Sequence, residues 1–233
     1  MIAVLPDSNL LPLFAGLHLQ VAVRAGLAGH GNLWVDDVSS PRCARLLVNT
    51  FNFLGGEPNH DWPAHLPASS VWVSGAAWST CLQHAWGARL RAEHRRSMIP
   101  PALFDAAALA PSDGLGALRE AVPQEVDAFR SLAETLAPVP FEQVPGVGVW
   151  LGGELIAGAT AFAHHNDDAE AEIDVAELWW GRGIGRRVSA AWLTAVLHRG
   201  LKPHWDAANL ASERIATRLG FHTGPQWTAH WFS

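Results

Sequence analysis

The sequence predicts a mixed α/β fold, and two observations carry this prediction. The second half of the chain alternates apolar strand-like and helix-like segments, in the order strand, strand, strand, helix, strand, helix, strand. The composition is that of a globular protein, with 49% hydrophobic and 16% charged residues. A chain of 233 residues fits one large or two small domains and can bury a substantial core.

Composition also limits the partners. A net charge of −6 with 16 Lys+Arg leaves no broad basic surface, so no nucleic-acid partner is expected. Residues 10–26 are apolar, but Pro12, Arg24 and two further polar residues keep them short of the roughly 20 apolar residues of a membrane span. They also lack a signal-peptide pattern, and we interpret them as a helix of a soluble protein. The isolated Cys43 and Cys81 are expected to be buried thiols of a cytoplasmic protein.

The first half carries several element signals. Residues 31–58 predict a strand, a turn around Ser39 to Pro41, and a longer strand that ends at Gly55 and Gly56. Residues 69–75 predict a further strand. The helix predicted over residues 76–90 places four side chains on one face, namely Trp78, Leu82, Ala85 and Trp86.

Residues 101–116 separate the two halves. They combine small residues with Pro and Gly breakers, so we expect an N-terminal α/β lobe over residues 1–111 and a second domain over residues 112–233. A helix is predicted at residues 123–137, with Pro123 in its first turn and an apolar stripe of Val126, Phe129, Leu132 and Leu136. The strand patterns around Trp34 and Trp150 are similar, which leaves open whether the first lobe is a degenerate copy of the second.

The second half has clearer turn and helix-cap signals than the first. Residues 146–165 predict a hairpin about Gly152 and Gly153, and residues 171–178 predict a central strand. A glycine-rich loop and a helix to about His198 follow, then a short strand over residues 202–207. A last helix begins after Asn209, a favourable N-cap, and ends at Gly220.

The glycine-rich loop predicts a phosphate site. A loop between a strand and a helix exposes backbone N–H groups at the positive end of the helix dipole. Gly181, Gly183 and Gly185 allow close approach and positive φ, while Arg182, Arg186 and Arg187 add positive charge. A dinucleotide-binding fingerprint would need a glycine where Arg186 stands, and a P-loop would need Gly-Lys-Ser/Thr at its end. The sequence therefore matches neither of these two common nucleotide-binding motifs.

Two separated motifs together resemble one known family. "WGRGIGRRV", joined to "PHWDAANLASERIATRLGF", is similar to the acyl-CoA-binding core of the GNAT superfamily of N-acetyltransferases. "EID" before the loop and "PHWDAANLAS" after it resemble the zwittermicin-resistance branch, and the similarity runs from about Phe141 to Phe221. The resemblance implies a mixed, mostly antiparallel central sheet flanked by helices. If the internal similarity of the two halves is real, the first lobe is a second, degenerate GNAT-like copy that lacks the glycine loop.

The resemblance implies a set of cofactor-binding residues. The strand before the loop would part from the strand after the helix, and pantetheine would lie between them along Val175, Ala176, Glu177 and Leu178. The pyrophosphate would be held by the loop, namely Trp180, Gly181, Arg182, Gly183, Ile184, Gly185, Arg186 and Arg187. Asn209 would contact the cofactor or cap its helix, and Ser212 lies one turn further.

The sequence departs from the family pattern in two places. The Arg or Gln that usually opens the loop motif is Trp180, so one side-chain contribution to the pyrophosphate turn is absent. The tyrosine that many members use as general acid would fall at Ala216, and the chain contains no tyrosine. The second departure puts the usual general acid in doubt.

Carboxylates near the loop are the candidate bases. Amide formation needs a neutral amine, and an alkyl amine with a pKa of about 10.4 must first lose a proton. Glu172 and Asp174 share one strand face and Glu177 lies on the other, so we predict the first two as catalytic and Glu177 as a reserve. A solvated strand face remains the alternative for each. The leaving thiol, with a pKa of about 8.5, needs little help, and Ser212 or a water would supply its proton.

These observations predict an acetyl-CoA-dependent N-acetyltransferase with a small-molecule amine as acceptor, acting as a monomer or homodimer. His164 and His165 lie at an expected hairpin turn, so no metal site is predicted. Two alternatives stay open: a non-catalytic module that binds acyl-CoA or an amine, and an acetyltransferase that acts on a protein or peptide. An amine antibiotic as acceptor is implied only by the branch resemblance.

Overall fold

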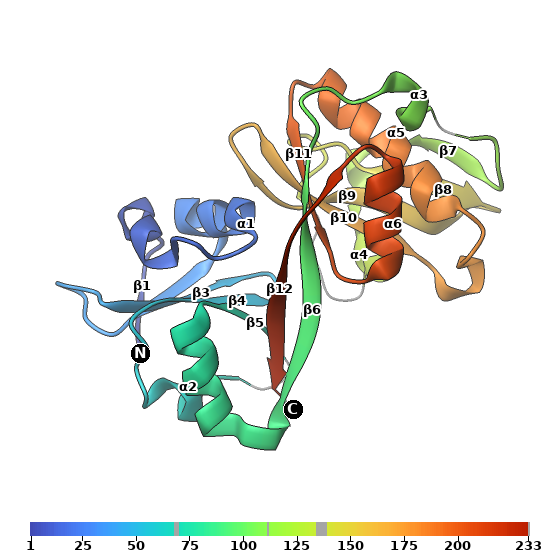
Figure 1. Ribbon diagram of the computed structural model, residues 1–233. Helices are drawn as coiled ribbons and strands as arrows, with labels where there is room; N and C mark the ends of the chain where they lie inside the picture. Colours follow the sequence, from blue (N-terminus) through green and yellow to red (C-terminus); the bar gives the residue numbers. More distant parts are fainter. Residues whose placement is uncertain (68–69, 111, 134–138, 233) are drawn as a thin grey trace. The chain divides into compact units, whose positions relative to one another are not determined.

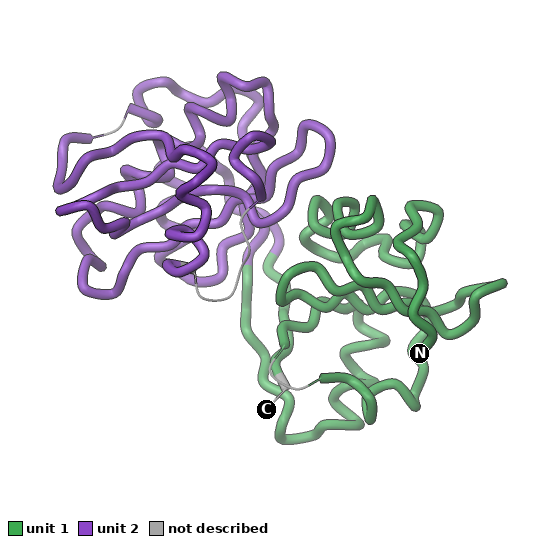
Figure 2. Tube along the Cα trace, turned by 180° about the vertical axis from the view of Figure 1, so that it is seen from behind, with its two compact units in different colours: residues 1–95, 226–233 green, residues 96–225 purple. Residues whose placement is uncertain are grey.

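The computed structural model describes residues 1–67, 70–110, 112–133 and 139–232. The chain divides into two compact units, residues 1–95 with 226–233 (unit 1) and residues 96–225 (unit 2), coloured separately in Figure 2. The sequence placed the boundary at residues 111 and 112. The structure places it at residues 95 and 96, because residues 96–98 pair with a strand of unit 2, and it assigns the last residues to unit 1.

Unit 1 combines a sheet with helices on both faces. Its elements are β1 (Ile2–Val4), η1 (Ser8–Phe14), α1 (Gln20–Ala25), η2 (Gly26–His30), β2 (Asn32–Val35), β3 (Cys43–Val48), β4 (Phe51–Gly56), η3 (Trp62–His65), β5 (Val71–Ser74), α2 (Ala76–Trp86), η4 (Gly87–Arg89), the first part of β6 (Leu90–Ile99) and most of β12 (His222–Phe232).

The strand order in unit 1 is β1-β2-β3-β4-β5-β12. β4 and β5 are parallel, while β1 to β4 pair antiparallel in sequence. α1 and α2 lie on opposite faces of this sheet (Figure 1). Under α2, Trp72 and Leu54 pack with Trp78, Leu82 and Trp86 in one buried cluster. The tryptophans predicted from periodicity therefore form core.

Unit 2 contains the segments expected to form the site. Its elements are the end of β6, α3 (Ala106–Leu109), β7 (Ala117–Glu120), η5 (Pro123–Glu125), α4 (Val126–Ala133), β8 (Val147–Leu151), β9 (Glu154–His165), β10 (Asp168–Val175), η6 (Glu177–Trp179), α5 (Ile184–His198), β11 (Lys202–Ala207), α6 (Leu210–Arg218) and the start of β12.

The sheet of unit 2 has the order β6-β11-β10-β9-β8-β7. β10 and β11 pair in parallel, whereas β11 with β6, β10 with β9, β9 with β8 and β8 with β7 pair antiparallel. α5 packs on one face, where Val188, Trp192 and Val196 join the core formed by β8, β9 and β11. α4 packs on the other face, where Phe129 lies against Gly158 of β9. The mixed, mostly antiparallel sheet predicted from the sequence is confirmed.

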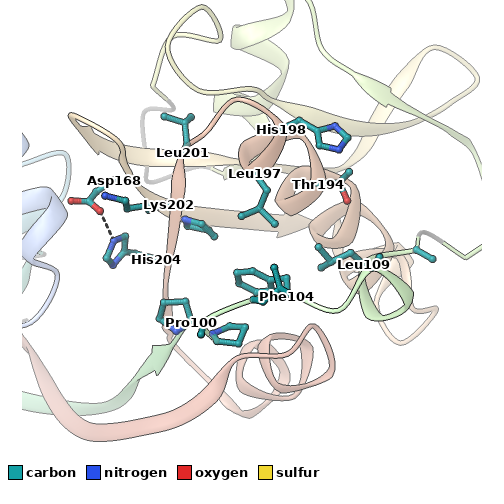
Figure 3. Close-up of a pocket in the computed structure, with 16 residues that line it drawn as sticks. Pro100, Phe104, Leu109, Asp168, Thr194, Leu197, His198, Leu201, Lys202 and His204 are labelled. Carbon is teal, nitrogen blue, oxygen red and sulfur yellow. Dashed lines mark hydrogen bonds and ion pairs between the residues drawn. The ribbon is translucent and has the colours of Figure 1, made fainter.

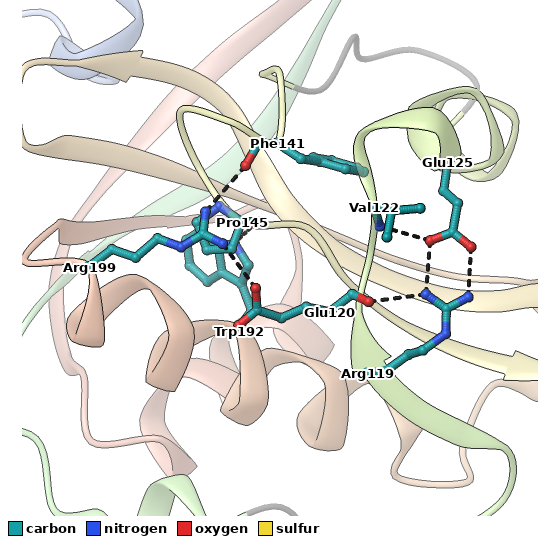
Figure 4. A network of polar contacts seen from close by, with 8 residues as sticks. All are labelled: Arg119, Glu120, Val122, Glu125, Phe141, Pro145, Trp192 and Arg199. Carbon is teal, nitrogen blue, oxygen red and sulfur yellow. Dashed lines mark hydrogen bonds and ion pairs between the residues drawn. The ribbon is translucent and has the colours of Figure 1, made fainter.

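Polar contacts hold α5 to the segments before β8 (Figure 4). The indole nitrogen of Trp192 donates to the carbonyl of Pro145 over 2.9 Å, and both residues are buried. Arg199, just after α5, donates to the carbonyl of Phe141 over 3.2 Å and to Glu120 over 2.9 Å. These contacts fix the helix that begins at the glycine loop.

The two units repeat one strand pattern. In unit 1, β2, β3 and β4 pair antiparallel and β5 then joins β4 in parallel. In unit 2, β8, β9 and β10 pair antiparallel and β11 then joins β10 in parallel. The link between β4 and β5 carries a four-residue 3-10 turn where unit 2 has the 15-residue α5. The pattern supports the degenerate copy, which remains a prediction.

Three local expectations need correction. The long strand expected before Gly55 is two strands, β3 and β4, because Asn49 adopts a positive φ of 52° and turns the chain. Ala85 is exposed and Cys81 takes its place on the buried face of α2. The helix expected to residue 137 is described to Ala133, and Leu136 lies outside the described residues.

Candidate functional site

The expected site lies where β10 and β11 part. Their parallel register joins three residue pairs, which begin at Asp168 and end at Glu170 on β10. β10 has a bulge directly after Glu170, and a bulge bends the strand that carries it. β10 continues beside β9 to Val175, whereas β11 continues beside β6. The two strands therefore diverge while each keeps its outer neighbour.

This divergence leaves one edge of β10 open. Residues 171–175 pair with β9 on one side, and the described part of the chain places no strand on their other side. Backbone N–H and C=O groups on such an edge bind an extended polar chain as a further strand would. The gap between the diverging strands is therefore suited to a long, amide-bearing ligand.

The loop after β10 depends on glycine for its conformation. Gly181 and Gly183 have φ values of +74° and +76°, in the left-handed region that favours glycine. A Cβ at either position would meet no atom within 4 Å, so the surface of the loop backbone is uncovered. At Gly185 a Cβ would lie 3.1 Å from Ile215 and 3.4 Å from Val175, so glycine keeps the first turn of α5 close to β10 and α6.

The beginning of α5 presents free backbone donors. Gly183 is its N-cap residue, and no side chain caps the helix. The first α-helical bond runs from the amide of Arg187 to the carbonyl of Gly183 over 3.2 Å, so the amides of the three residues between them have no intrahelical acceptor. Together with the positive end of the helix dipole, they form a site for phosphate oxygens.

The loop arginines have divided roles. Arg186 donates to the carbonyl of Ala108 over 3.1 Å, and Arg187 donates to the carbonyls of Leu115 and Gly116 over 2.7 and 3.3 Å. Both guanidinium groups thus hold the segment that leads into β7, although their charge stays beside the loop. Arg182 lies over the ring of Trp179 at 5.0 Å, as expected of a cation–π pair.

Trp180 turns back onto the end of β10. Its indole nitrogen donates to the carbonyl of Val175 over 2.6 Å, and the side chain is 63% exposed. The amide of Ala176 donates to Ile156 of β9, and Glu177 begins a 3-10 turn. The extended edge therefore includes Val175 and stops there, while residues 176–178 leave the strand.

The two predicted catalytic carboxylates lie side by side. Glu172 and Asp174 stand opposite Thr160 and Gly158 of β9, on the α4 face of the sheet. Their carboxyl groups are close enough to form a hydrogen bond, which requires a proton on one of the two. Burial raises the pKa of Asp174 above its ordinary value of 3.8, and the hydrogen bond with Glu172 acts in the opposite direction. A raised pKa makes a carboxylate a stronger base near neutral pH.

The start of α6 carries the last two predicted site residues, Asn209 and Ser212. The side chain of Asn209 accepts from the amide of Ser212 over 2.9 Å, which is the predicted N-cap. The hydroxyl oxygen of Ser212 accepts from the indole of Trp205 over 3.0 Å. Ala216, at the position where the family pattern has tyrosine, is fully buried.

Comparisons with known proteins agree with this geometry. Residues 140–230 match the family model described as GNAT acetyltransferase. A GCN5-related N-acetyltransferase-like protein from Streptococcus suis 89/1591 has a TM-score of 0.85 at 24% identity, with 97% of each chain covered. A GCN5-related N-acetyltransferase from Sphaerobacter thermophilus has a TM-score of 0.57 at 14% identity, with 98% of this chain and 94% of that chain covered.

A tandem GNAT protein from the clavulanic acid biosynthesis pathway has a TM-score of 0.59 at 13% identity, with 98% of this chain and 96% of that chain covered. No curated protein matches the chain. The chain has the GNAT fold. The diverging strands and the glycine loop lie within the segment that matches the GNAT family model, as the sequence predicted.

The structure adds contacts around the expected site that the sequence did not indicate. The carbonyl partners of Arg186 and Arg187 lie 71 to 78 residues upstream, in a segment without periodicity. The bond from Trp180 to Val175 spans five residues across an irregular turn. Neither contact has a sequence signal. The hydrogen bond between Glu172 and Asp174 does have one, because strand alternation places residues two apart on one face.

The described residues were also compared with the requirements of a metal site and of a membrane span. Among the described residues, no group of three or more His, Cys, Asp or Glu is arranged to hold a metal ion. None of the described helices combines the length and apolar character needed to cross a membrane.

Proposed function

We propose that the chain is an acetyl-CoA-dependent N-acyltransferase that transfers an acetyl group to the primary amine of a small molecule. One observation carries the proposal: the ladder between β10 and β11 ends after three residue pairs, and the open edge leads into an uncapped glycine loop at the start of α5. An extended amide chain that ends in a pyrophosphate has groups that match both parts.

The chain offers a separate set of groups to each part of acetyl-CoA. Amides of the loop residues 181–186 would hold the pyrophosphate, because Gly181 and Gly183 leave that backbone uncovered. The open edge at residues 171–175 would hold the pantetheine arm. The carbonyl of Val175 already accepts from the indole nitrogen of Trp180 over 2.6 Å and keeps one further lone pair for the cofactor. The exposed Trp180 side chain would therefore lie beside the pantetheine arm at the end of this edge.

The carboxylate pair would serve the acceptor. Acetyl-CoA supplies a thioester whose carbonyl carbon accepts the amine nitrogen. The C–N bond forms, the C–S bond breaks, and the thiolate leaves with the electron pair. Asp174, with Glu172 beside it, would take the proton that the amine loses, either directly or through water. The pair lies on the α4 face, so the amine would approach the gap between the strands from that side.

The thiolate then needs a proton. No tyrosine exists in the chain, and Ala216 stands buried where many GNAT members carry one. The Ser212 hydroxyl accepts from Trp205, so its own hydrogen is free to be donated to the thiolate or to a water. A thiol with a pKa of about 8.5 is a good leaving group without this help. Placing the two reactants together would supply most of the acceleration.

Calorimetric titration with acetyl-CoA tests the proposal, with ATP as a ligand control. Gly183→Asp puts a carboxylate beside the expected pyrophosphate and should weaken acetyl-CoA binding at least tenfold, equivalent to about 1.4 kcal/mol. Gly200→Asp is the matched control: Gly200 has φ +73°, no atom within 4 Å of its Cβ position, and lies at the other end of α5. Equal binding by both variants would refute the cofactor site.

A second candidate is a non-catalytic module that binds acyl-CoA. The contact of Trp180 with Val175, together with the missing tyrosine, favours it. Release of free thiol with a panel of primary amines, including amine antibiotics, separates the candidates. Acetyl-CoA binding without thiol release for any amine would support the module. Release that depends on Asp174 would support the enzyme.

A further inference from the structure

Unit 1 contains a buried arginine that has no counter-charge among the described residues. Arg45 lies on β3 and is only 7% exposed. Its one hydrogen bond within the described part of the chain runs from Nε to the side-chain oxygen of Asn52, over 2.8 Å. Burial lowers the pKa of Arg45, and no described carboxylate offsets this effect. Buried arginines in folded proteins are normally paired, so an anion is missing from this place.

Two tryptophans hold the guanidinium group of Arg45 in place. Its central carbon lies 4.3 Å from the ring centroid of Trp34 and 5.6 Å from that of Trp72. These cation–π contacts fix the position of the group but neutralise none of its charge. Nη1 and Nη2 have no hydrogen bond to a described residue, and neither is among the partnerless atoms that are sealed from solvent. The Nη edge of the guanidinium is therefore free and reachable.

Further polar atoms without partners lie on the same face of the sheet. Trp72 is the register partner of both Asn52 and His230, so these three side chains share one face. Arg45 shares it too, because its register partner Leu54 packs with Trp72 on the face that α2 covers (Figure 1). Nδ2 of Asn52, Nε1 of Trp72 and Nδ1 of His230 are buried without a hydrogen-bond partner among the described residues. Since Nδ2 and Nε1 can only donate, this part of the face lacks acceptors.

We propose that unit 1 binds a small monocarboxylate at Arg45. The two carboxylate oxygens accept from Nη1 and Nη2, the edge that Asn52 leaves free, in the bidentate geometry that an arginine fork favours. A monoanion balances the single positive charge, whereas a phosphate dianion would leave a net negative charge in a buried place. Arg45 belongs to unit 1 and the proposed acetyl transfer uses residues of unit 2, so each can be tested without the other.

Calorimetric titration of the full chain with acetate, benzoate and their amides tests the proposal in a chloride-free buffer. Each amide has nearly the shape of its carboxylate but carries no charge. At least one carboxylate is expected to bind at least tenfold more tightly than its own amide. Equal affinity within both pairs, or no binding of either carboxylate, would overturn the proposal. Tighter binding of inorganic phosphate than of both carboxylates would also overturn it.

Variants locate the binding at the guanidinium group. Asn52→Asp supplies a carboxylate to Arg45 from within the chain and should weaken carboxylate binding at least tenfold, and Arg45→Met should abolish it. Arg119→Met is the matched control, since Arg119 also lies over a tryptophan, Trp150 at 3.8 Å, but already donates to Glu125 over 2.6 and 2.9 Å. Thermal unfolding of each variant verifies folding, and Asn52→Asp keeps the test open if Arg45→Met unfolds. Carboxylate binding that survives in the folded variants of Arg45 and Asn52 would refute the site.

The ring of benzoate has an alternative place in unit 2. A largely apolar pocket of about 700 Å³ lies beside the end of α5, where Phe104 and Leu197 face the cavity (Figure 3). Leu197→Trp fills this pocket and should leave the binding of both carboxylates unchanged. Loss of carboxylate binding in the folded Leu197→Trp variant would place the ligand in unit 2 and overturn the proposal.

Discussion

Replacing Trp192 by phenylalanine measures how firmly α5 is held under the glycine loop. Trp192 is fully buried, and its indole nitrogen donates over 2.9 Å to the carbonyl of Pro145. Phenylalanine has no N–H group, so this buried carbonyl loses its partner, at a cost of about 1–3 kcal/mol. The smaller ring also leaves space in the core, which adds about 1 kcal/mol. The free energy of unfolding should fall by about 2–4 kcal/mol.

Urea unfolding followed by far-UV circular dichroism measures this loss. Trp180→Phe is the matched control, because Trp180 also donates to a backbone carbonyl but is 63% exposed, where water replaces the lost bond. Its expected loss is about 0.5 kcal/mol or less. The reasoning is refuted if Trp192→Phe lowers the free energy of unfolding no more than Trp180→Phe does.

Four further outcomes are expected. Asn209→Ala should cost about 1 kcal/mol of stability through the lost N-cap, whereas Asn209→Asp should cost little, as thermal unfolding would show. The raised pKa of Asp174 means that its contribution to stability is present below the unfolded value of 3.8 and is lost as pH rises through the folded value. Asp174→Asn should therefore unfold at higher urea than the parent at about pH 7, and this gain should disappear near pH 3. For the parent protein, kcat/KM of the proposed acetyl transfer should fall on the acid side as Asp174 becomes protonated, at a pH above 3.8. Burial raises the pKa of Cys43 to about 12, so iodoacetamide at about pH 8 should modify Cys43 only after unfolding, detectable by mass spectrometry.

Local signals explain why the second half of the fold was predictable. The residues that start or end the β8–β9 hairpin, the glycine loop, α5 and α6 lie within a few positions of each element. Examples are the Asn209 cap and the glycines of the loop. β6 was missed because its ten residues, "LRAEHRRSMI", are mostly polar and only Met98 is buried. It is a strand because it pairs with β11, which no local pattern encodes.

The candidate sites likewise divide into features that local sequence patterns predict and features that only tertiary packing creates. The carboxylate pair follows from strand alternation, and the glycine loop follows from glycine spacing. The pocket beside the end of α5 is lined by residues 100–110, Asp168 and residues 194–204, which only tertiary packing brings together. The burial that raises the pKa of Asp174 also depends on neighbours distant in the sequence.

Because β12 completes unit 1, this unit is discontinuous in sequence. Its strand pairs with β5 through His230 and Trp231, and the Trp227 ring stacks on His18 at 4.9 Å. A ribosome therefore releases the whole of unit 2, residues 96–225, before it releases the strand that unit 1 needs. We expect unit 2 to fold before unit 1, which reverses the usual N-to-C order of folding during synthesis. Until β12 is made, the β5 edge of the unit 1 sheet stays unpaired. A released chain truncated after residue 225 would then show protease resistance in unit 2 alone.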